Sequence, residues 1–300
     1  MASKVLFQGS GTALVTPFVD GKVDVAALAR LVDFQIENGT AALIACGTTG
    51  EPSTMTPEER GLVVREVVRA AKGRVPVVAG TGSNATQSVI AAANRFRDIG
   101  CDAQLVVTPY YNKTTQEGLY RHYMEVAEHT ELPIMIYNVP SRTALDISPE
   151  VMERLAECEK FIGLKESSYQ LPYVMEKIRR IRGRMPVYSG NDDMVVPLLA
   201  MGAQGVVSVA SNVLPGQMAE ITRLYLAGDT AGAAAVQLQL LPFIQALFAE
   251  VSPIPCKAVM EMLGLCGGEL RLPLVPASAD TREKLRKALA DLGVELAVRG

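Results

Sequence analysis

Eight short segments that are apolar at nearly every position recur along the first two thirds of the chain. Runs of this length, hydrophobic without alternation, are typical of strands buried on both faces of a parallel sheet. The segments are Thr12–Val15, Ala42–Ala45, Val75–Ala79, Gln104–Val107, Ile134–Tyr137, Phe161–Leu164, Pro186–Ser189 and Val206–Val209.

Amphipathic stretches separate these segments. Val25–Glu37, Glu58–Ala71 and Thr86–Gly100 place their apolar residues on one side at helical spacing. Thr56 followed by Pro57 supplies a cap and a first-turn proline, which are signals for the start of a helix. The regular alternation of strand and helix predicts an α/β fold in which a parallel sheet is covered by helices.

Eight such units predict a (β/α)8 TIM barrel over residues 1–214. The alternative is an open, doubly wound sheet, but the glycine-rich phosphate turn typical of that fold is not found in the sequence. Residues 215–300 are expected to add the last barrel helix and a C-terminal helical region. The helices expected there are Met218–Ala227, Ala231–Glu250, Pro255–Leu263 and Ala279–Leu292.

Composition excludes several classes of function. Lys and Arg number 29 against 32 Asp and Glu, which argues against a nucleic-acid or membrane surface. The apolar stretch from Ala231 to Val251 is interrupted by glutamines and Pro242, so we expect a packed helix. Five cysteines without a CxxC pair, and an N-terminus without a long apolar segment, predict a cytoplasmic protein without disulfides. His122 and His129 are the only histidines, so a histidine-rich metal site is not expected.

The most informative residue is Lys165, which ends the apolar run Phe161–Leu164. In a barrel of this kind the carboxyl ends of the strands line the active site. A lysine there is expected to lose its hydration, which favours the neutral amine that attacks a ketone to form a Schiff base. The alternative is a structural lysine that extends to solvent or pairs with an acid. Its neighbour Glu166 should point to the opposite face of the strand and is interpreted as structural.

Hydroxyl groups are abundant at the other strand ends. Thr49, Tyr111 and Tyr137 follow three different strands and could meet at the mouth of the barrel as a proton relay. Buried tyrosines also serve simply as packing anchors. Arg142 follows a Val-Pro-Ser turn, where a guanidinium could bind a substrate carboxylate or lie exposed in a loop. The turn Gly47–Gly50 could hold a carboxylate on its backbone N–H groups.

Taken together, the motifs resemble the dihydrodipicolinate synthase family of pyruvate-dependent class I aldolases and lyases. The resemblance extends from about Leu6 to Leu214. The strings that carry it are GTTGE at 47–51, TPYYNKTTQEGLY at 108–120, YNVPSRT at 137–143, GLKES at 163–167 and SGND at 189–192. It implies a lyase, a carbon–oxygen lyase by convention, that condenses pyruvate with L-aspartate 4-semialdehyde on the diaminopimelate route to lysine. No cofactor or metal is implied beyond the covalent imine on the enzyme.

The resemblance also assigns catalytic roles. Lys165 matches the imine-forming lysine, Tyr137 the tyrosine that exchanges protons at the imine, and Thr49 and Tyr111 the other members of the relay. Relatives bring the relay tyrosine, or its neighbour Tyr110, across a tight dimer interface. The resemblance therefore implies a homo-oligomer, a dimer or a tetramer.

The same comparison of motifs implies substrate contacts. Thr48 and Thr49 match residues that bind the pyruvate carboxylate through backbone N–H groups, and Val207 matches a main-chain pyruvate contact. Arg142 matches the arginine that holds the aldehyde's carboxylate, with Gly190 and Asn191 beside it. Asn191 stands where many relatives have Asp, a change expected to have little effect if backbone atoms act there.

A possible allosteric pocket departs further from the family pattern. Asn84 and Tyr110 match, but Pro57, Arg60 and Ser88 stand where lysine-inhibited relatives carry two histidines and a glutamate. A lysine ammonium favours an acid and is repelled by a guanidinium. We therefore expect weak inhibition by lysine or none.

Two alternatives to the synthase are considered. A sister pyruvate aldolase, of the N-acetylneuraminate or 2-keto-3-deoxygluconate lyase type, would keep Lys165 and Tyr137, but Arg142 suits an acidic aldehyde better than sugar hydroxyls. A barrel subunit without catalytic activity is the other, although every matched catalytic position is intact.

Overall fold

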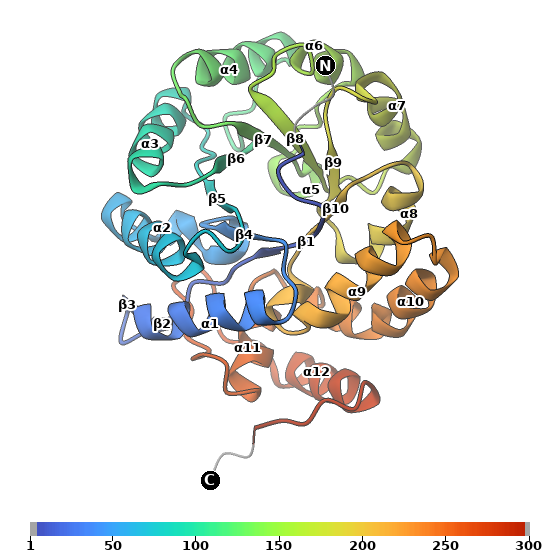
Figure 1. The fold of residues 1–300 in the computed structure, drawn as a ribbon. Coiled ribbons are helices and arrows are strands. Elements are labelled where there is room, and N and C mark those ends of the chain that lie inside the picture. The colour runs from blue at the N-terminus through green and yellow to red at the C-terminus, as the bar shows by residue number, and fades with distance from the viewer. Residues whose placement is uncertain (1–4, 298–300) are drawn as a thin grey trace.

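The computed structural model describes residues 5–297, and these form a closed parallel barrel. The eight strands follow the order β1-β10-β9-β8-β7-β6-β5-β4 around the barrel, and β4 pairs with β1 to close it. Figure 1 shows the strands at the centre of a ring of helices. The strands are β1 (Gly9–Ala13), β4 (Ala42–Ala45), β5 (Val77–Gly80), β6 (Ala103–Val107), β7 (Ile134–Asn138), β8 (Phe161–Glu166), β9 (Val187–Ser189) and β10 (Gly205–Ser208).

Helices connect successive strands, as the sequence predicts. The barrel helices are α1 (Val25–Glu37), α2 (Pro57–Ala71), α3 (Thr86–Ile99), α4 (Gln116–Glu128), α5 (Pro140–Thr143), α6 (Pro149–Leu155), α7 (Leu171–Ile181), α8 (Val195–Ala200) and α9 (Pro215–Leu226). Short 3-10 turns η1 (Thr48–Gly50), η2 (Pro52–Thr54), η3 (Asp192–Met194) and η4 (Ala210–Asn212) follow several strand ends. A small hairpin, β2 (Phe18–Val19) with β3 (Lys22–Val23), precedes α1 and was not predicted.

Helix starts follow the expected capping chemistry. The Thr56 side chain accepts the Glu59 N–H, and the Glu59 carboxylate accepts the Thr56 N–H, which completes a capping box at the start of α2. The Ser148 hydroxyl accepts the Val151 N–H at the start of α6, where Pro149 occupies the first helical position. Gly100 ends α3 with φ of +101°, a conformation that costs glycine little.

Apolar side chains fill the barrel interior as well as the space between strands and helices. Phe7 enters the barrel and stacks on the Tyr188 ring with 4.4 Å between centroids. The Tyr188 hydroxyl donates to the Phe7 carbonyl oxygen at 2.7 Å. Small residues in β1 leave room for this arrangement, because a Cβ at Gly11 would lie 3.0 Å from the Phe7 ring. The lower barrel is therefore a packed core.

The first strand begins and ends earlier in the chain than the sequence predicts. Thr12–Val15 was predicted, whereas β1 is Gly9–Ala13. The ladder extends back to Gly9 because Gly9 and Gly205 approach so closely that a Cβ on Gly205 would lie 1.8 Å from the Gly9 carbonyl oxygen. Leu14 and Val15 lie beyond the ladder, although Leu14 still donates to the Ile44 carbonyl oxygen.

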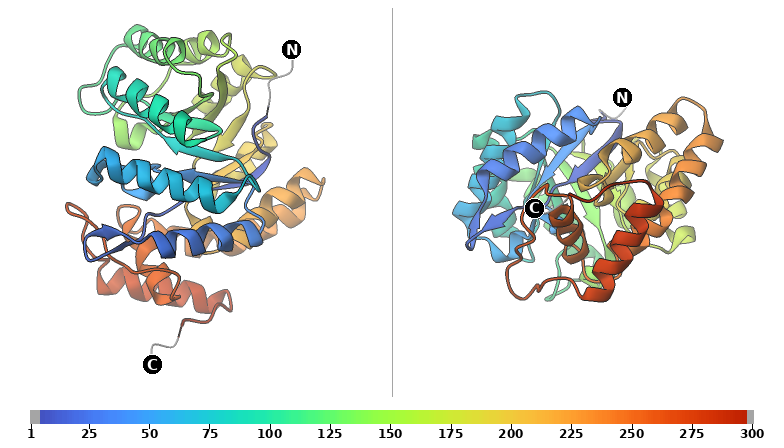
Figure 2. Two further views of the ribbon diagram at one scale, coloured as in Figure 1. Left: turned by 60° about the vertical axis from the view of Figure 1, so that its left-hand side comes forward. Right: turned by 90° about the horizontal axis from the view of Figure 1, so that it is seen from below.

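The C-terminal region adds three helices beside the barrel: α10 (Thr230–Leu247), α11 (Ile254–Met262) and α12 (Ala279–Asp291). Figure 1 and the left view of Figure 2 show α11 and α12 below the ring of barrel helices. By length and composition α10 could cross a membrane, but 39% of its residues are buried inside the structure. It packs against α8, α9 and α12, an arrangement also usual for a core helix. All five cysteines are free thiols.

Candidate active site

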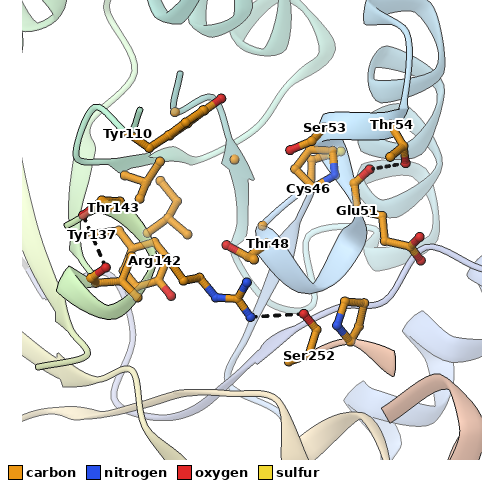
Figure 3. Close-up of a pocket in the computed structure, with 18 of the residues that line it drawn as sticks. Cys46, Thr48, Glu51, Ser53, Thr54, Tyr110, Tyr137, Arg142, Thr143 and Ser252 are labelled. Atoms are coloured by element: carbon orange, nitrogen blue, oxygen red, sulfur yellow. Dashed lines mark hydrogen bonds between the residues drawn. The ribbon is translucent and has the colours of Figure 1, made fainter. Parts of the chain in front are cut away.

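A cavity of about 320 Å³ opens at the carboxyl ends of the strands. Figure 3 shows residues from several separate loops around it. The barrel contributes residues after β4, β5, β6 and β7, and the C-terminal region forms another side of the cavity. The polar and aromatic lining includes Cys46, Thr48, Glu51, Ser53, Thr54, Tyr110, Tyr137, Arg142, Thr143 and Ser252. Burial raises the pKa of the Cys46 thiol to about 12, so this sulfur is a poor nucleophile.

Lys165 lies against the ring of Tyr137, which lines this cavity. The two residues are register partners on β8 and β7, so their side chains point the same way. Lys165 Nζ lies 4.2 Å from the centroid of the Tyr137 ring. The lysine is only 5% exposed and the tyrosine 6%. The structure thus brings together the predicted nucleophile and the predicted proton-exchanging hydroxyl in a nearly dry environment.

Glu166 points away from Lys165, as predicted, into a buried polar network behind the strand. Its carboxylate accepts from Asn138 Nδ2 at 2.7 Å and from Lys177 Nζ at 3.1 Å. Burial raises the pKa of the Glu166 carboxyl, and the Lys177 ammonium opposes that rise. Asp146 completes the network through contacts with both Lys177 and Asn138. These contacts fix the end of β8 and thereby the direction of Lys165.

The two threonines of the turn after β4 occupy different environments. Thr48 is exposed and lines the cavity. Thr49 is 4% exposed and is not among the residues that line the cavity. Adjacent residues of a 3-10 turn project in different directions, so only one of the two hydroxyls can face the opening. The relay role of Thr49 stays a prediction, and Thr48 is a second candidate because it lines the cavity.

Tyr111 does not join Tyr137 within this chain. It is 91% exposed, and its positive φ of +69° turns it out of the loop after β6. The predicted meeting of Thr49, Tyr111 and Tyr137 is thus absent among residues 5–297 of the single chain. Its neighbour Tyr110, 36% exposed, does line the cavity. A fully exposed tyrosine beside an active-site opening is available to a second copy of the chain.

Arg142 is held by the C-terminal region. Its Nη2 donates to the Ser252 carbonyl oxygen at 3.1 Å, and both residues line the cavity (Figure 3). The short helix α5 carries Arg142 directly after β7. Within residues 5–297 the other guanidinium N–H groups have no hydrogen-bond partner, so they can bind a carboxylate in the cavity. The sequence does not predict this role of Ser252, because it holds Arg142 with its backbone carbonyl oxygen, which every residue type carries.

The residues after β9 and on β10 approach Lys165 from the other side. Gly190 donates its N–H to the Glu166 carbonyl oxygen at 2.7 Å, and Val207 belongs to the cluster inside the barrel. Asn191 Nδ2 is buried without a hydrogen-bond partner among the described residues. Asp192 was not singled out in the sequence, yet its carboxylate accepts the Val209 and Ala210 N–H groups and joins the ends of β9 and β10. Burial raises the pKa of the Asp192 carboxyl, and hydrogen bonds from the Ser208 side chain and from the Ala210 and Val209 N–H groups oppose that rise.

Of the possible allosteric positions, Tyr110 lines the cavity. Arg60 Nη2 donates to the Gly80 carbonyl oxygen at 2.8 Å, and the guanidinium lies over the Phe96 ring. The Asn84 carbonyl oxygen accepts from Asn112 at 3.0 Å. The guanidinium is thus fixed by the protein itself. Weak inhibition by lysine stays a prediction.

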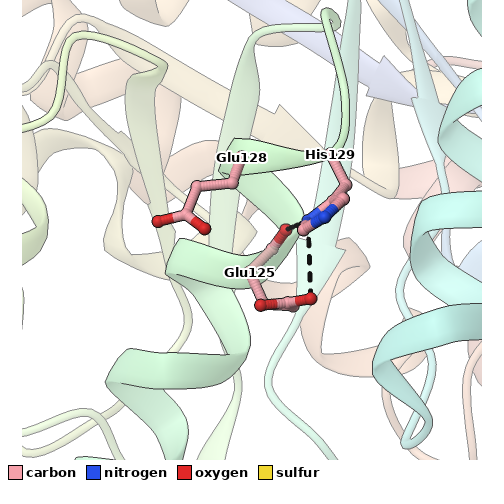
Figure 4. A group of neighbouring side chains, drawn as sticks. All are labelled: Glu125, Glu128 and His129. Atoms are coloured by element: carbon pink, nitrogen blue, oxygen red, sulfur yellow. Dashed lines mark hydrogen bonds and ion pairs between the residues drawn. The ribbon is translucent and has the colours of Figure 1, made fainter.

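One surface cluster has donor atoms that could hold a metal ion. Glu125, Glu128 and His129 lie together at the end of α4, where His129 Nδ1 lies 3.4 Å from the Glu125 carboxylate (Figure 4). Glu128 and His129 are exposed and Glu125 is partly so. Exposed acidic groups of this kind are common on helix surfaces, and the cluster lies outside the cavity.

Comparisons with known proteins agree with the geometry. A sequence model of the Dihydrodipicolinate synthetase family matches residues 6–292. The 4-hydroxy-tetrahydrodipicolinate synthase of Caldicellulosiruptor bescii is 47% identical over 292 residues, covering 97% of this chain and 99% of that protein. The enzyme of the same name from Alkaliphilus oremlandii is 46% identical over 93% of this chain and 97% of its own length.

Solved structures agree in fold along nearly the whole chain. Dihydrodipicolinate synthase from Aquifex aeolicus superposes with a TM-score of 0.95 at 44% identity, covering 97% of this chain and 100% of that chain. The enzyme from Thermotoga maritima gives a TM-score of 0.94 at 42% identity, covering 96% and 99%. With a buried lysine beside a tyrosine at the mouth of a (β/α)8 barrel and full-length relatives of this kind, the chain belongs to the dihydrodipicolinate synthetase family.

Proposed function

We propose that this chain is an enzyme that condenses pyruvate with L-aspartate 4-semialdehyde, the 4-hydroxy-tetrahydrodipicolinate synthase activity for which its relatives are named. The observation that carries the proposal is the placement of Lys165 Nζ 4.2 Å from the Tyr137 ring centroid, beside a cavity that Arg142 and Thr48 line. The activity belongs to the diaminopimelate route to lysine. By convention it is classed with the carbon–oxygen lyases.

The first stage forms an imine. The neutral Lys165 amine attacks the ketone carbon of pyruvate, and the resulting carbinolamine loses water. Tyr137 carries its hydroxyl on the ring that lies against this nitrogen, so we assign it to donate and accept the proton that this loss requires. We assign the next member of the relay to the turn after β4, where Thr49 is the predicted residue and Thr48, which lines the same cavity, is a second candidate. Backbone N–H groups of the turn, with Val207, are assigned to the pyruvate carboxylate.

The second stage joins the substrates. Loss of a proton from the pyruvyl methyl group gives an enamine, whose carbon attacks the aldehyde carbon and forms the new C–C bond. Arg142 holds the carboxylate of the aldehyde substrate, beside Gly190 and Asn191. The substrate's amino group then attacks the imine carbon, closes the ring and releases the Lys165 amine. The sum consumes one molecule of each substrate and releases one water, with no net oxidation, so we propose that no cofactor is needed.

A second copy of the chain is part of the proposal. Tyr111 is 91% exposed beside the opening, and we assign its hydroxyl to the relay of a partner subunit. The partner is therefore a second copy of this chain, and the assembly is a homo-oligomer, either a dimer or a tetramer. Asn84 and Tyr110 are assigned to a pocket near this interface. A cytoplasmic location also stays a prediction.

The test is chemical trapping followed by turnover. Incubation with pyruvate and borohydride should leave a reduced pyruvyl group on Lys165, identified by peptide mass spectrometry, while Lys165→Met should take up none. A folded protein that fails to trap pyruvate would support an inactive barrel. Comparison of aspartate semialdehyde with sugar-acid aldehydes then separates the synthase from a sister aldolase.

A further inference from the structure

An ion pair links the C-terminal region to the turn that carries Thr48. Lys257 Nζ on α11 donates to Glu51 Oε1 at 2.5 Å and to the Glu269 carbonyl oxygen at 2.7 Å. Both side chains are buried, with 0% and 1% of their surface exposed. The ammonium also lies 4.2 Å from the centroid of the Phe18 ring. The contact joins residues 206 positions apart in the sequence.

Glu51 holds the end of the Thr48 turn in an unfavourable backbone conformation. Its φ of +54° is left-handed, and its N–H donates to the Thr48 carbonyl oxygen at 3.2 Å. A residue without glycine's freedom stays in this region only when its surroundings fix it. The carboxylate supplies that constraint through Lys257 and through the Arg271 N–H at 3.3 Å. The position of Thr48 in the cavity thus depends on contacts made by the C-terminal region.

The same C-terminal segment also holds the opposite side of the cavity. Ser252, a few residues before Lys257, accepts the Arg142 hydrogen bond. Val251, Ser252 and Pro253 line the cavity together with Glu51. The segment that leads into and begins α11 therefore contacts both the turn assigned to pyruvate and the arginine assigned to the aldehyde.

A buried ion pair is not by itself a good source of stability. Removing two charges from water is costly, and apolar residues of similar size often replace such pairs without loss. What an ion pair gives instead is a fixed geometry between the elements it joins. Here those elements are a catalytic turn and a helix that is not part of the barrel.

We propose that Lys257 is a positioning residue for the condensation. Its ion pair with Glu51 fixes the turn that carries Thr48, so the geometry of the active site depends on the C-terminal region. The proposal rests on the proposed function for its kinetic readout.

The experiment compares two variants of the full-length protein. Glu51→Gln/Lys257→Met removes both charges at similar volume, so that neither is left buried without a partner. Arg282→Met is the control, because it breaks the 2.6 Å ion pair between α12 and Glu261 on α11 without touching Glu51. For the double variant we expect a rise in the KM for pyruvate and a fall in kcat/KM of about 10-fold or more. The control should keep wild-type kinetics.

Hydrogen–deuterium exchange supplies a readout that does not depend on activity. The peptide covering residues 47–55 should exchange faster in the double variant than in wild type, at comparable melting temperatures, and unchanged in the control. Wild-type KM and exchange in the double variant would overturn the proposal, as would equal kinetic losses in both variants at equal melting temperature. If wild type itself fails to trap pyruvate, the proposed function fails, and the exchange experiment still decides whether Lys257 positions the turn.

Discussion

Gly190 lies directly against the side chain of Lys165. A Cβ added at Gly190 would lie 3.0 Å from Lys165 Cε and 2.0 Å from Ser167 Oγ. Real Cβ atoms essentially never lie 2.0 Å from another atom, and 3.0 Å is tighter than most Cβ contacts, so a side chain here must displace the serine hydroxyl and press on the lysine. The glycine thus shapes the space in which the amine lies.

Gly190→Ala should therefore reduce imine formation more than it reduces stability. We expect kcat to fall about 100-fold, because small displacements of a reacting group have effects of that size. Stopped-flow trapping of pyruvate and thermal melting measure the two effects. Gly61→Ala is a matched control inside α2, where the nearest atom to an added Cβ is 3.8 Å away. A Gly190→Ala enzyme with wild-type kcat would contradict this account of the lysine's position.

The hydroxyl of Tyr137 is predicted to act in proton transfer while its ring supports Lys165. Tyr137→Phe keeps the ring and removes the proton donor, so kcat should fall by about 100-fold or more with little change in melting temperature. Tyr188→Phe is the comparison, because the Tyr188 hydroxyl is bonded to the Phe7 carbonyl oxygen below the site. If both variants lose the same activity, the hydroxyl of Tyr137 has no special role.

Tyr111 is predicted to act in a partner's active site, and mixed oligomers can test this. A heterodimer of one Tyr111→Phe chain and one Lys165→Met chain, purified with two different tags, contains one site with both residues intact if the tyrosine crosses the interface. We expect about half of the wild-type activity from this heterodimer, and almost none from either homodimer. Activity at about half the Tyr111→Phe homodimer level would instead place Tyr111 in the site of its own chain.

His122 should make stability depend on pH. It is 8% exposed, and burial lowers its pKa to about 4 from the usual 6.5. The unfolded chain therefore binds a proton between these pH values and the folded chain does not, so stability is full above pH 6.5 and falls as the pH approaches 4. At pH 5 the loss is about 1–2 kcal/mol.

Urea unfolding at pH 7 and pH 5 measures this effect, with His122→Gln as the comparison. The variant should lose less stability than wild type between the two pH values, because its side chain does not titrate. Identical losses in the two proteins would show that His122 is protonated in the folded state as well.

Thiol chemistry should distinguish one cysteine from the other four. Burial raises the pKa of Cys46 and Cys101 to about 12 and that of Cys266 to about 11, and it also raises the pKa of Cys256. Cys158 is partly exposed. With a thiol-specific disulfide reagent at pH 8 we expect one fast equivalent per native chain and five after unfolding. Cys158→Ser should abolish the fast equivalent, and rapid labelling of Cys46 would contradict the prediction.

Much of the fold could be predicted because the physics that sets it is local. Continuous apolar runs indicated all eight strands, and α1 was predicted with its observed bounds, Val25–Glu37. The β2–β3 hairpin was missed since two-residue strands have no periodicity to detect. The first strand was misplaced because its own residues are small and a packing partner, Phe7, fills the space beneath them.

The site was predictable only in part. Lys165 stood out because a lysine at the end of an apolar run is unusual, and Glu166 was correctly expected to face away from it. The choice between Thr48 and Thr49 depends on the direction of side chains in a 3-10 turn, which composition does not reveal. Lys257 and Ser252 act through long-range contacts, so their neighbours in the sequence carry no indication of them.

Closure of the barrel also constrains the order in which the enzyme can be made. β1 pairs with β4 on one side and with β10 on the other, in the register Gly9 to Gly205. During synthesis on the ribosome the second edge of β1 therefore stays unpaired until β10 has been made. A nascent chain that stalls before residue 205 exposes unpaired strand edges on both β1 and β9, which are templates for aggregation. We therefore expect the half-made polypeptide to aggregate more readily than the finished protein.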